Sequence, residues 1–320
     1  MGAVNVPGAP PAPRPVEVAV LVPCYNEAQT ISQVVADFRA ALPDATIYVY
    51  DNNSKDGTAE IARNAGAVVR TEHRQGKGNV VRRMFSDIDA DVYLLVDGDD
   101  TYEAAAAPRM VGEILDKQLD KVNGIRVHSD QKAYRPGHVT GNRLLSGLVT
   151  ELFGVKSRDM LSGYKALSRR FVKSFPSTSS GFEIETELLI HAIELDLPMT
   201  EIETAYKERP EGSVSKLSTF RDGFRILGMI VQLVRDLMPL KFFSIIAAVL
   251  ALFSIGFVTP VIYEFFLTGL VPRFPTLIVS SVVMSIAVLS LFAGLILDSV
   301  ARGRRETKLL AYLRYPMVSK

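Results

Sequence analysis

Several residue types that mark common protein classes are scarce in this chain of 320 residues. Tryptophan is missing and Cys24 is the only cysteine, so no disulfide can form within the chain, and a reducing compartment suits it. The 36 Lys and Arg residues almost balance the 35 Asp and Glu residues, and the net charge of +1 creates no field that would attract nucleic acid. We therefore expect one large domain or two ordinary ones, and no nucleic-acid partner.

The usual backbone cradles for phosphate are also missing. The chain has no Gly-x-x-x-x-Gly-Lys-Ser/Thr motif, and no Gly-x-Gly-x-x-Gly follows its first apolar run. Gly76-Lys77-Gly78 alone is a weak signal. If the chain binds a diphosphate, we expect a metal ion to be its partner rather than backbone amides.

Long uncharged stretches occur near the C-terminal end. Residues 242–263 and 274–297 contain no charged side chain, and each stretch is long enough to cross a bilayer as a helix. They also account for a mean hydropathy of +0.18, which is high for a soluble enzyme. We expect a transmembrane hairpin, and the alternative is a helical hairpin buried in a soluble core.

Basic residues follow the second uncharged stretch. They are Arg302, Arg304, Arg305, Lys308 and Arg314. The positive-inside rule places this segment in the cytoplasm, and two spans return the chain to the side that it left. We therefore predict a multi-pass protein of the inner (cytoplasmic) membrane whose large N-terminal domain lies in the cytoplasm.

Composition divides the chain into five parts. Residues 1–15 are rich in Gly, Ala and Pro, a composition that predicts a disordered tail. They lack the apolar core of a signal peptide. Residues 16–218 have globular composition and form the expected catalytic domain. Residues 219–240 are amphipathic and predict a helix in the membrane interface, although packing on the catalytic domain is an alternative. The hairpin then occupies 241–298, and a basic cytoplasmic tail occupies 299–320.

Apolar runs alternate with helical periodicity in the first part of the globular domain. The runs predict strands at 16–22, 46–50, 67–70 and 92–96, and the periodic segments between them predict helices. This alternation predicts an α/β fold with a mostly parallel, doubly wound sheet. Further expected elements are helices at 104–117 and 141–153 and strands at 121–127 and 200–206. Residues 159–167 are expected to form a loop and a strand, and residues 181–194 a loop and a helix.

Acidic residues follow the buried strand predicted at 92–96. Asp97-Gly98-Asp99-Asp100 places three carboxylates within four residues, and such groups repel one another unless a cation neutralises them. Carboxylate oxygens are ligands of hard divalent cations, and Mg²⁺ bound this way takes further ligands from water and phosphate. The alternative is a solvated acidic loop.

Polar clusters also follow the first two predicted strands, at residues 23–27 and 51–54. Since the carboxyl ends of parallel strands meet at one edge of a sheet, these clusters and Asp97–Asp99 should converge on one crevice. A ligand site explains three such clusters better than a solvated surface does.

The order and spacing of these motifs resemble those of family-2 glycosyltransferases with a GT-A fold. The matching blocks are residues 22–27, 51–58, 76–79 and 97–99. Later blocks at 159–164, 181–185 and 209–217 resemble the polyprenyl-phosphate branch, which includes dolichol-phosphate mannose synthases and bacterial undecaprenyl-phosphate sugar transferases. The resemblance covers about residues 16–220 and implies a GT-A catalytic domain.

The resemblance also implies a role for each matched position. Nucleotide-sugar contacts are expected from Pro23, Tyr25, Asn26, Glu27, Asp51, Asn53, Ser54, Lys77, Asp97 and Gly98. Asp97 and Asp99 should hold Mg²⁺ or Mn²⁺, and Thr101 replaces a Gln that the family often has. Catalytic positions are Asp159, near the reacting sugar, and the cations Arg126, Arg143, Arg209 and Lys216, which would hold the lipid phosphate or the diphosphate.

The implied activity is that of an inverting, metal-dependent hexosyltransferase. It would move one sugar from a UDP- or GDP-linked donor to an undecaprenyl or dolichyl phosphate, beside a lipid bilayer and as a homo-oligomer. A phosphate monoester is largely ionised near neutral pH, so its acceptor needs cations to position it more than it needs a base. The alternatives are a processive polysaccharide synthase, which carries a Gln-x-x-Arg-Trp motif that a chain without tryptophan lacks, and a non-catalytic membrane adaptor.

Overall fold

The computed structural model describes residues 15–128, 158–181, 183–207, 228, 231–232 and 234–318. The helix predicted at 141–153 and most of the amphipathic segment at 219–240 lie outside these residues. The described chain divides into two compact units, one made of residues 1–217 with 308–320 and the other of residues 218–307.

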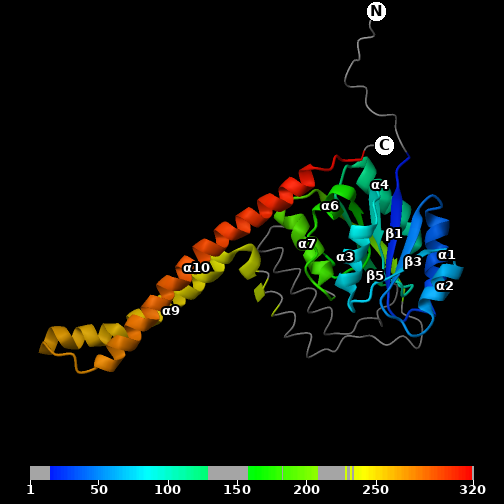
Figure 1. Ribbon diagram of the computed structural model, residues 1–320. Helices are drawn as coiled ribbons and strands as arrows, with labels where there is room; N and C mark the ends of the chain where they lie inside the picture. The colour runs from blue at the N-terminus through cyan, green and yellow to red at the C-terminus, as the bar shows by residue number, and fades with distance from the viewer. Residues whose placement is uncertain are drawn as a thin grey trace, which may run out of the picture. The chain divides into compact units, whose positions relative to one another are not determined.

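The first unit is built on a seven-stranded sheet flanked by helices (Figure 1). Its strands are β1 (Val18–Cys24), β2 (Thr46–Asp51), β3 (Val68–Thr71), β4 (Val92–Leu95), β5 (Lys121–His128), β6 (Lys165–Ser168) and β7 (Met199–Tyr206). Its helices are α1 (Ile31–Ala41), α2 (Thr58–Asn64), α3 (Lys77–Asp87), the 3₁₀ turn η1 (Ala104–Ala106), α4 (Ala107–Asp116), α6 (Arg169–Ser174) and α7 (Ile184–Glu194).

The strand order is β3-β2-β1-β4-β6-β5-β7. The first four strands of this order are parallel to one another, as the alternating sequence predicts. β6 runs antiparallel to both β4 and β5, whereas β5 and β7 are parallel. The sheet is therefore the mixed, mostly parallel sheet of a GT-A-like α/β fold, and the predicted fold class is confirmed.

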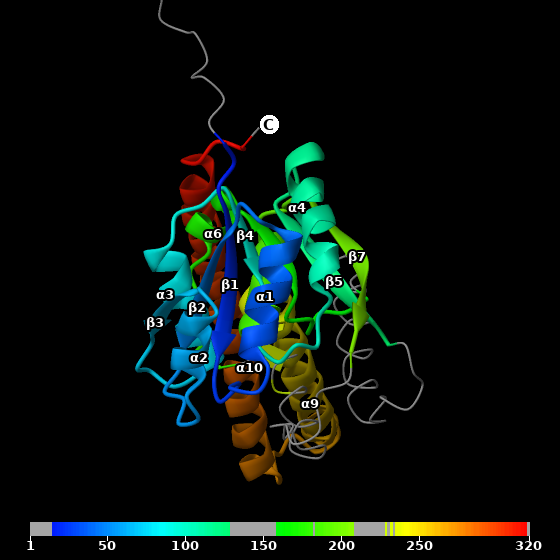
Figure 2. The same ribbon diagram turned by 90° about the vertical axis from the view of Figure 1, so that its right-hand side faces the viewer.

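Helices cover both faces of the sheet. One apolar cluster packs α1 and α4 against Val20 and Val22 of β1, and the other packs α3, α6 and α7 against Ala19 and Leu21 of the same strand. Because successive strand residues point to opposite faces, a strand buried on both sides is apolar throughout. Figures 1 and 2 show α1 on the opposite side of the sheet from α3.

β1 ends two residues later than the sequence predicts. Pro23 and Cys24 lie in the strand, paired with Tyr50 and Asp51 of β2. The predicted strand stops before Pro23 because proline has no backbone N–H to donate. Near the last position of a strand, however, a proline removes little of the hydrogen-bond ladder.

The second unit is a helical hairpin. It comprises α9 (Pro239–Thr268) and most of α10 (Phe274–Leu313), both long and apolar enough to cross a membrane. Small residues spaced by seven line the contact, since Ala247 and Ser254 of α9 and Ser280, Ala287 and Gly294 of α10 are buried. The Ser254 hydroxyl donates to the Ser280 carbonyl oxygen at 2.7 Å. Small side chains let helices approach closely, as they do in membrane hairpins.

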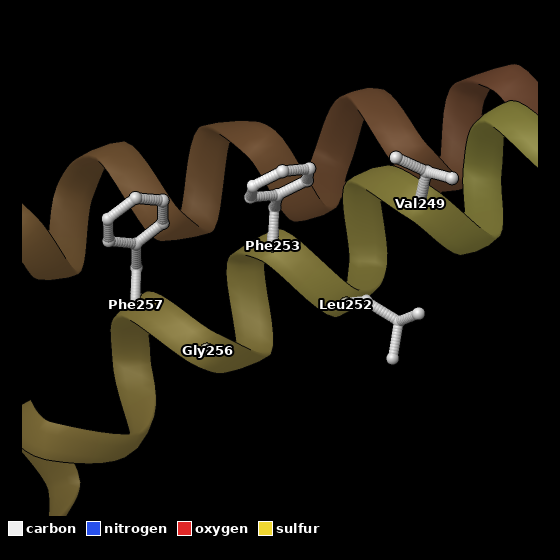
Figure 3. A pocket seen from close by; sticks show the side chains of 5 residues that line it. All are labelled: Val249, Leu252, Phe253, Gly256 and Phe257. Carbon is white, nitrogen blue, oxygen red and sulfur yellow. The ribbon is translucent and has the colours of Figure 1, made fainter.

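The rest of the hairpin surface is apolar and exposed. A shallow hollow on α9 is lined by Val249, Leu252, Phe253, Gly256 and Phe257, and Figure 3 shows Phe253 and Phe257 pointing to the same side of the helix. Phe253 is 59 % exposed and Leu252 is 70 % exposed. Such a surface suits lipid rather than water, which disfavours a hairpin buried in a soluble core.

The end of α10 belongs to the first unit. Tyr312 donates a hydrogen bond to Oδ2 of Asp120 at 2.9 Å, and the Arg170 guanidinium lies 4.8 Å from the centre of the Tyr312 ring. Asp120 is fully buried and also accepts from Arg170 Nε at 2.6 Å. Lys308 forms an ion pair with Glu194 of α7. The segment that follows the hairpin thus packs on the domain that precedes it.

Candidate active site

The loops after β1, β2 and β4 meet at one edge of the sheet, as predicted. The backbone N–H of Asn26 donates to Ser54 Oγ at 2.8 Å, and that of Glu27 donates to Thr58 Oγ1 at 2.9 Å. The Thr30 hydroxyl donates to the Gly98 carbonyl oxygen at 2.7 Å. Three segments far apart in sequence therefore form one connected surface.

Two asparagines fix the shape of these loops. Asn26 and Asn53 have positive φ angles of 53° and 66°. Asn26 Oδ1 accepts from the Lys55 N–H at 2.9 Å, and Asn53 Nδ2 donates to the His73 carbonyl oxygen at 3.0 Å. Asparagine tolerates the left-handed conformation better than most residues. The structure thus uses the predicted nucleotide-binding residues Asn26, Asn53 and Ser54 to join loops to one another.

Asp51 has one carboxylate oxygen without a partner. Its Oδ2 accepts from the Ser54 N–H at 3.1 Å, while Oδ1 is buried and has no hydrogen-bond partner within the part of the chain that the structure describes. A buried acceptor without a donor costs free energy until a donor arrives. A ligand hydroxyl or N–H group, such as those of a nucleoside, would supply one.

Lys77 bridges two carboxylates. Its Nζ lies 2.5 Å from Asp97 Oδ1 and 2.5 Å from Glu185 Oε1. Burial by itself lowers the pKa of Lys77, but the charges and hydrogen bonds of Asp97 and Glu185 outweigh that effect and hold this pKa well above its usual value. Lys77 is therefore a fixed positive charge at the site.

The glycines beside Lys77 allow a close backbone approach. A Cβ on Gly76 would lie 2.1 Å from the Ser180 carbonyl oxygen, and one on Gly78 would lie 2.4 Å from that of Ser179. Gly76 also has a φ of 128°. The Gly-Lys-Gly motif thus presses the start of α3 against residues 179–181, which lead into α7.

Asp99 and Asp97 are the carboxylates suited to a cation. Asp99 is buried, and its Oδ1 accepts from the Thr101 hydroxyl at 2.6 Å. The side chain of Asp97 is 26 % exposed. The described residues contain no group of three His, Cys, Asp or Glu side chains placed to hold a metal. Two carboxylates fit a divalent cation that takes its other ligands from water and a diphosphate.

Gly163 approaches the Asp97 carboxylate closely. A Cβ at this position would lie 2.2 Å from Asp97 Oδ2. The Gly163 N–H donates to the Tyr102 hydroxyl oxygen at 2.7 Å, which holds the glycine in place. Asp97 therefore has room for its carboxylate only because position 163 has no side chain.

Arg126 and Asp159 form a two-pronged ion pair. Arg126 Nε lies 2.7 Å from Asp159 Oδ2, and Nη2 lies 2.8 Å from Oδ1. Burial raises the pKa of Asp159, but the hydrogen bonds and charge of Arg126 lower it by more, and this pKa lies below its usual range. Asp159 therefore stays ionised near neutral pH and is poorly suited to be a proton acceptor.

The predicted site residues Arg143, Arg209 and Lys216 lie outside the described residues. Two other charged residues of the site did not appear among the predicted ones. Glu185 belongs to the matched block at 181–185, so that block was the available signal. Lys165, the first residue of β6, is fully buried, and burial lowers its pKa to about 8. Nothing in the sequence distinguishes Lys165 from a surface lysine.

The comparisons with known proteins agree with this geometry. The profile of glycosyl transferase family 2 matches residues 19–175. Protein RfbJ of Shigella flexneri is 56 % identical over 122 residues, which are 38 % of this chain and 95 % of RfbJ. Glycosyltransferase AglJ of Haloferax volcanii is 36 % identical over 258 residues, which are 79 % of this chain and 83 % of AglJ. The chain belongs to glycosyltransferase family 2.

A third relative and a solved structure add detail. A dolichyl-phosphate hexose transferase of Haloferax volcanii is 29 % identical over 216 residues, which are 68 % of this chain and 93 % of that protein. Glucosyl-3-phosphoglycerate synthase of Mycobacterium tuberculosis, solved with Mn²⁺, UDP-glucose and phosphoglyceric acid, aligns with a TM-score of 0.53 and 25 % identity over 68 % of this chain and 79 % of its own. The relatives RfbJ, AglJ and the dolichyl-phosphate hexose transferase support the polyprenyl-phosphate branch of the family.

Proposed function

We propose that the protein is an inverting hexosyltransferase that moves one sugar from a nucleotide-diphosphate sugar to a polyprenyl phosphate. The observation that carries this proposal is the meeting, at one sheet edge, of the carboxylates of Asp97 and Asp99 with Asp51 Oδ1, which has no hydrogen-bond partner among the described residues. The Asp51 oxygen suits a nucleoside, and the pair of carboxylates suits a cation beside its diphosphate. The relative named for dolichyl-phosphate hexose transfer supports the acceptor class.

Donor binding is assigned to the loops after β1 and β2. Asp51 accepts a hydrogen bond from the nucleoside, and Pro23, Tyr25, Glu27 and the chain around Gly98 border the same surface. Whether the base is uracil or guanine is left to experiment, and the UDP-glucose bound by the mycobacterial synthase favours UDP.

Asp97 and Asp99 would hold Mg²⁺ or Mn²⁺, which stabilises the charge that develops on the departing nucleoside diphosphate. Lys77 adds a fixed positive charge next to Asp97. Thr101 orients Asp99 through its hydroxyl, in the place where the family often has Gln.

The acceptor phosphate needs positioning by cations. Asp159 engages Nε and Nη2 of Arg126, and within the described residues Nη1 has no hydrogen-bond partner. Arg126 can therefore offer Nη1 to a phosphate oxygen while Asp159 keeps the guanidinium plane fixed. Arg143, Arg209 and Lys216 are proposed to complete this phosphate site.

The hairpin is proposed to span the inner membrane, with the catalytic domain on the cytoplasmic side. The exposed apolar surface of α9 and α10 and the basic residues beyond residue 299 support this topology. It would bring the enzyme to the surface where the head group of a lipid phosphate lies. The protein is also proposed to form a homo-oligomer.

The test is a transfer assay with the purified full-length protein. Undecaprenyl phosphate or dolichyl phosphate is mixed with Mn²⁺ or Mg²⁺ and each member of a panel of UDP- and GDP-sugars. One donor should yield a lipid-linked sugar, and a chelator should abolish the product. Asp99→Ala should remove turnover while leaving thermal unfolding close to wild type. Absence of product with every donor would refute the proposal, and activity in Asp99→Ala would refute the metal assignment.

A further inference from the structure

Lys77 lies between two carboxylates that differ in exposure. The Asp97 side chain is 26 % exposed, whereas that of Glu185 is 5 % exposed and that of Lys77 is 10 % exposed. Asp97 is therefore the partner on the open side of the site, and Glu185 is the partner on the buried side. Of these two carboxylates, Asp97 alone is also assigned as a metal ligand.

The two ends of the Lys77–Glu185 pair are held by the backbone. Lys77 is the first residue of α3, and Glu185 lies in the first turn of α7. The Gly78 N–H donates to the Gly181 carbonyl oxygen at 3.1 Å, which ties the two helix starts together. The pair can therefore persist if Asp97 changes its partner.

A divalent cation on Asp97 would change that partner. At a few ångströms an ammonium and a divalent cation repel strongly in a site of low dielectric constant. Lys77 and the cation therefore compete for the Asp97 carboxylate. A lysine with Asp97 as its sole anchor would either resist the cation or leave the site.

We propose that Glu185 is a positioning residue that retains the Lys77 ammonium when Asp97 exchanges it for a divalent cation. This inference rests on the proposed function and deepens it. Lys77 pairs with both Asp97 and Glu185 in the structure. Beside a bound cation it would stay at the site, held by Glu185, as a second positive charge near the diphosphate.

The pairing makes a specific prediction for Glu185→Gln. With the amide in place of the carboxylate, Asp97 is the one charged partner left to Lys77 among the described residues, and Lys77 competes harder for it. Mn²⁺ affinity should fall about tenfold, which is typical of the coupling between two linked sites. In a Lys77→Met background the competing ammonium is gone, so Glu185→Gln should change Mn²⁺ affinity less than about twofold.

The experiment measures Mn²⁺ binding to the full-length protein by electron paramagnetic resonance, without donor or acceptor. The variants are Glu185→Gln, Lys77→Met and the double variant. Glu60→Gln, an exposed carboxylate in α2, is the matched control and should bind Mn²⁺ as wild type does. Thermal unfolding checks that each variant folds, and Glu185→Asp, which keeps the charge, should retain more affinity than Glu185→Gln.

Two results would overturn the inference while leaving the proposed function standing. One is equal Mn²⁺ affinity in wild type and Glu185→Gln. The other is an equal loss in the wild-type and Lys77→Met backgrounds, which would mean that Glu185 acts through the fold or the general field. A wild-type protein that binds no Mn²⁺, even with UDP added, would instead remove the metal assignment and this inference together.

Discussion

Replacing Arg126 by Met should destabilise the first unit strongly, because it removes the two hydrogen bonds and the charge that Arg126 supplies to the buried Asp159 carboxylate. Asp159 is 4 % exposed, and the Arg126 side chain is 26 % exposed. Breaking a buried ion pair on one side costs roughly 3–5 kcal/mol, and the partial exposure of Arg126 favours the lower end, about 3 kcal/mol. For a unit of this size that free energy corresponds to a fall in melting temperature of roughly 6–12 °C.

The assay is thermal unfolding followed by near-ultraviolet circular dichroism, which reports on the 11 tyrosines of a chain without tryptophan. The double variant Arg126→Met/Asp159→Asn should recover part of the loss, because neither position of the pair then carries a charge. Arg158→Met is the matched control. Its ion pair with Glu203 joins side chains that are 64 % and 56 % exposed, and such a pair contributes less than about 1 kcal/mol.

The pH dependence gives a second check on the same pair. The folded-state pKa of Asp159 is lowered, so its contribution to stability is present above the unfolded pKa, about 3.9, and is lost as the pH falls through the folded value. The gap between wild type and Arg126→Met should therefore persist at neutral pH and shrink in acid. An Arg126→Met protein that melts with wild type, or single losses that simply add in the double variant, would refute the reasoning.

Three further predictions concern other contacts. Gly163→Ala should weaken Mn²⁺ binding and transferase activity at least tenfold, because the new Cβ would lie 2.2 Å from Asp97 Oδ2; unchanged Mn²⁺ affinity would contradict this. Tyr312→Phe should lower the melting temperature by about 3–6 °C, since a hydrogen bond to a charged group contributes about 1.5 kcal/mol, and a melting temperature equal to wild type would count against the Asp120 contact. Burial and the nearby Lys308 charge lower the pKa of His191 to about 3. As the pH falls below about 6.5, this histidine is therefore protonated in the unfolded chain before it is protonated in the folded protein, and the free energy of unfolding should drop by about 1.4 kcal/mol per pH unit. His191→Leu should flatten that dependence in acid titrations of stability, and an unchanged slope would exclude this histidine as its source.

The parallel half of the sheet was predicted well from the sequence, because strands buried on both faces consist of continuous apolar residues. The run at 92–96 and the acids after it mark β4 and the site edge without help from the fold. The antiparallel β6 was harder to predict, since it carries the charged Lys165 at a fully buried position. The residues that stabilise a buried lysine come from distant segments of the chain, so the local sequence pattern does not reveal them.

The candidate site shows the same division. The convergence of the loops after β1, β2 and β4 follows from strand direction alone. The pairing of Arg126 with Asp159 depends on how β5 lies against residues 158–164, and the bridge from Lys77 to Glu185 depends on how α3 lies against α7. Residues of such pairs could be identified by resemblance, but their partners required the tertiary structure.

The position of Tyr312 has a consequence for how the protein is made. Residues 218–307 are an insertion within the first unit, which is therefore discontinuous along the chain. During synthesis, Asp120 and Arg170 leave the ribosome long before Tyr312, and the apolar hairpin emerges in the interval. The enzyme domain can therefore reach its final packing only after the hairpin has been synthesised. A fragment that stops at residue 217 would contain every assigned site residue and still lack part of its own fold.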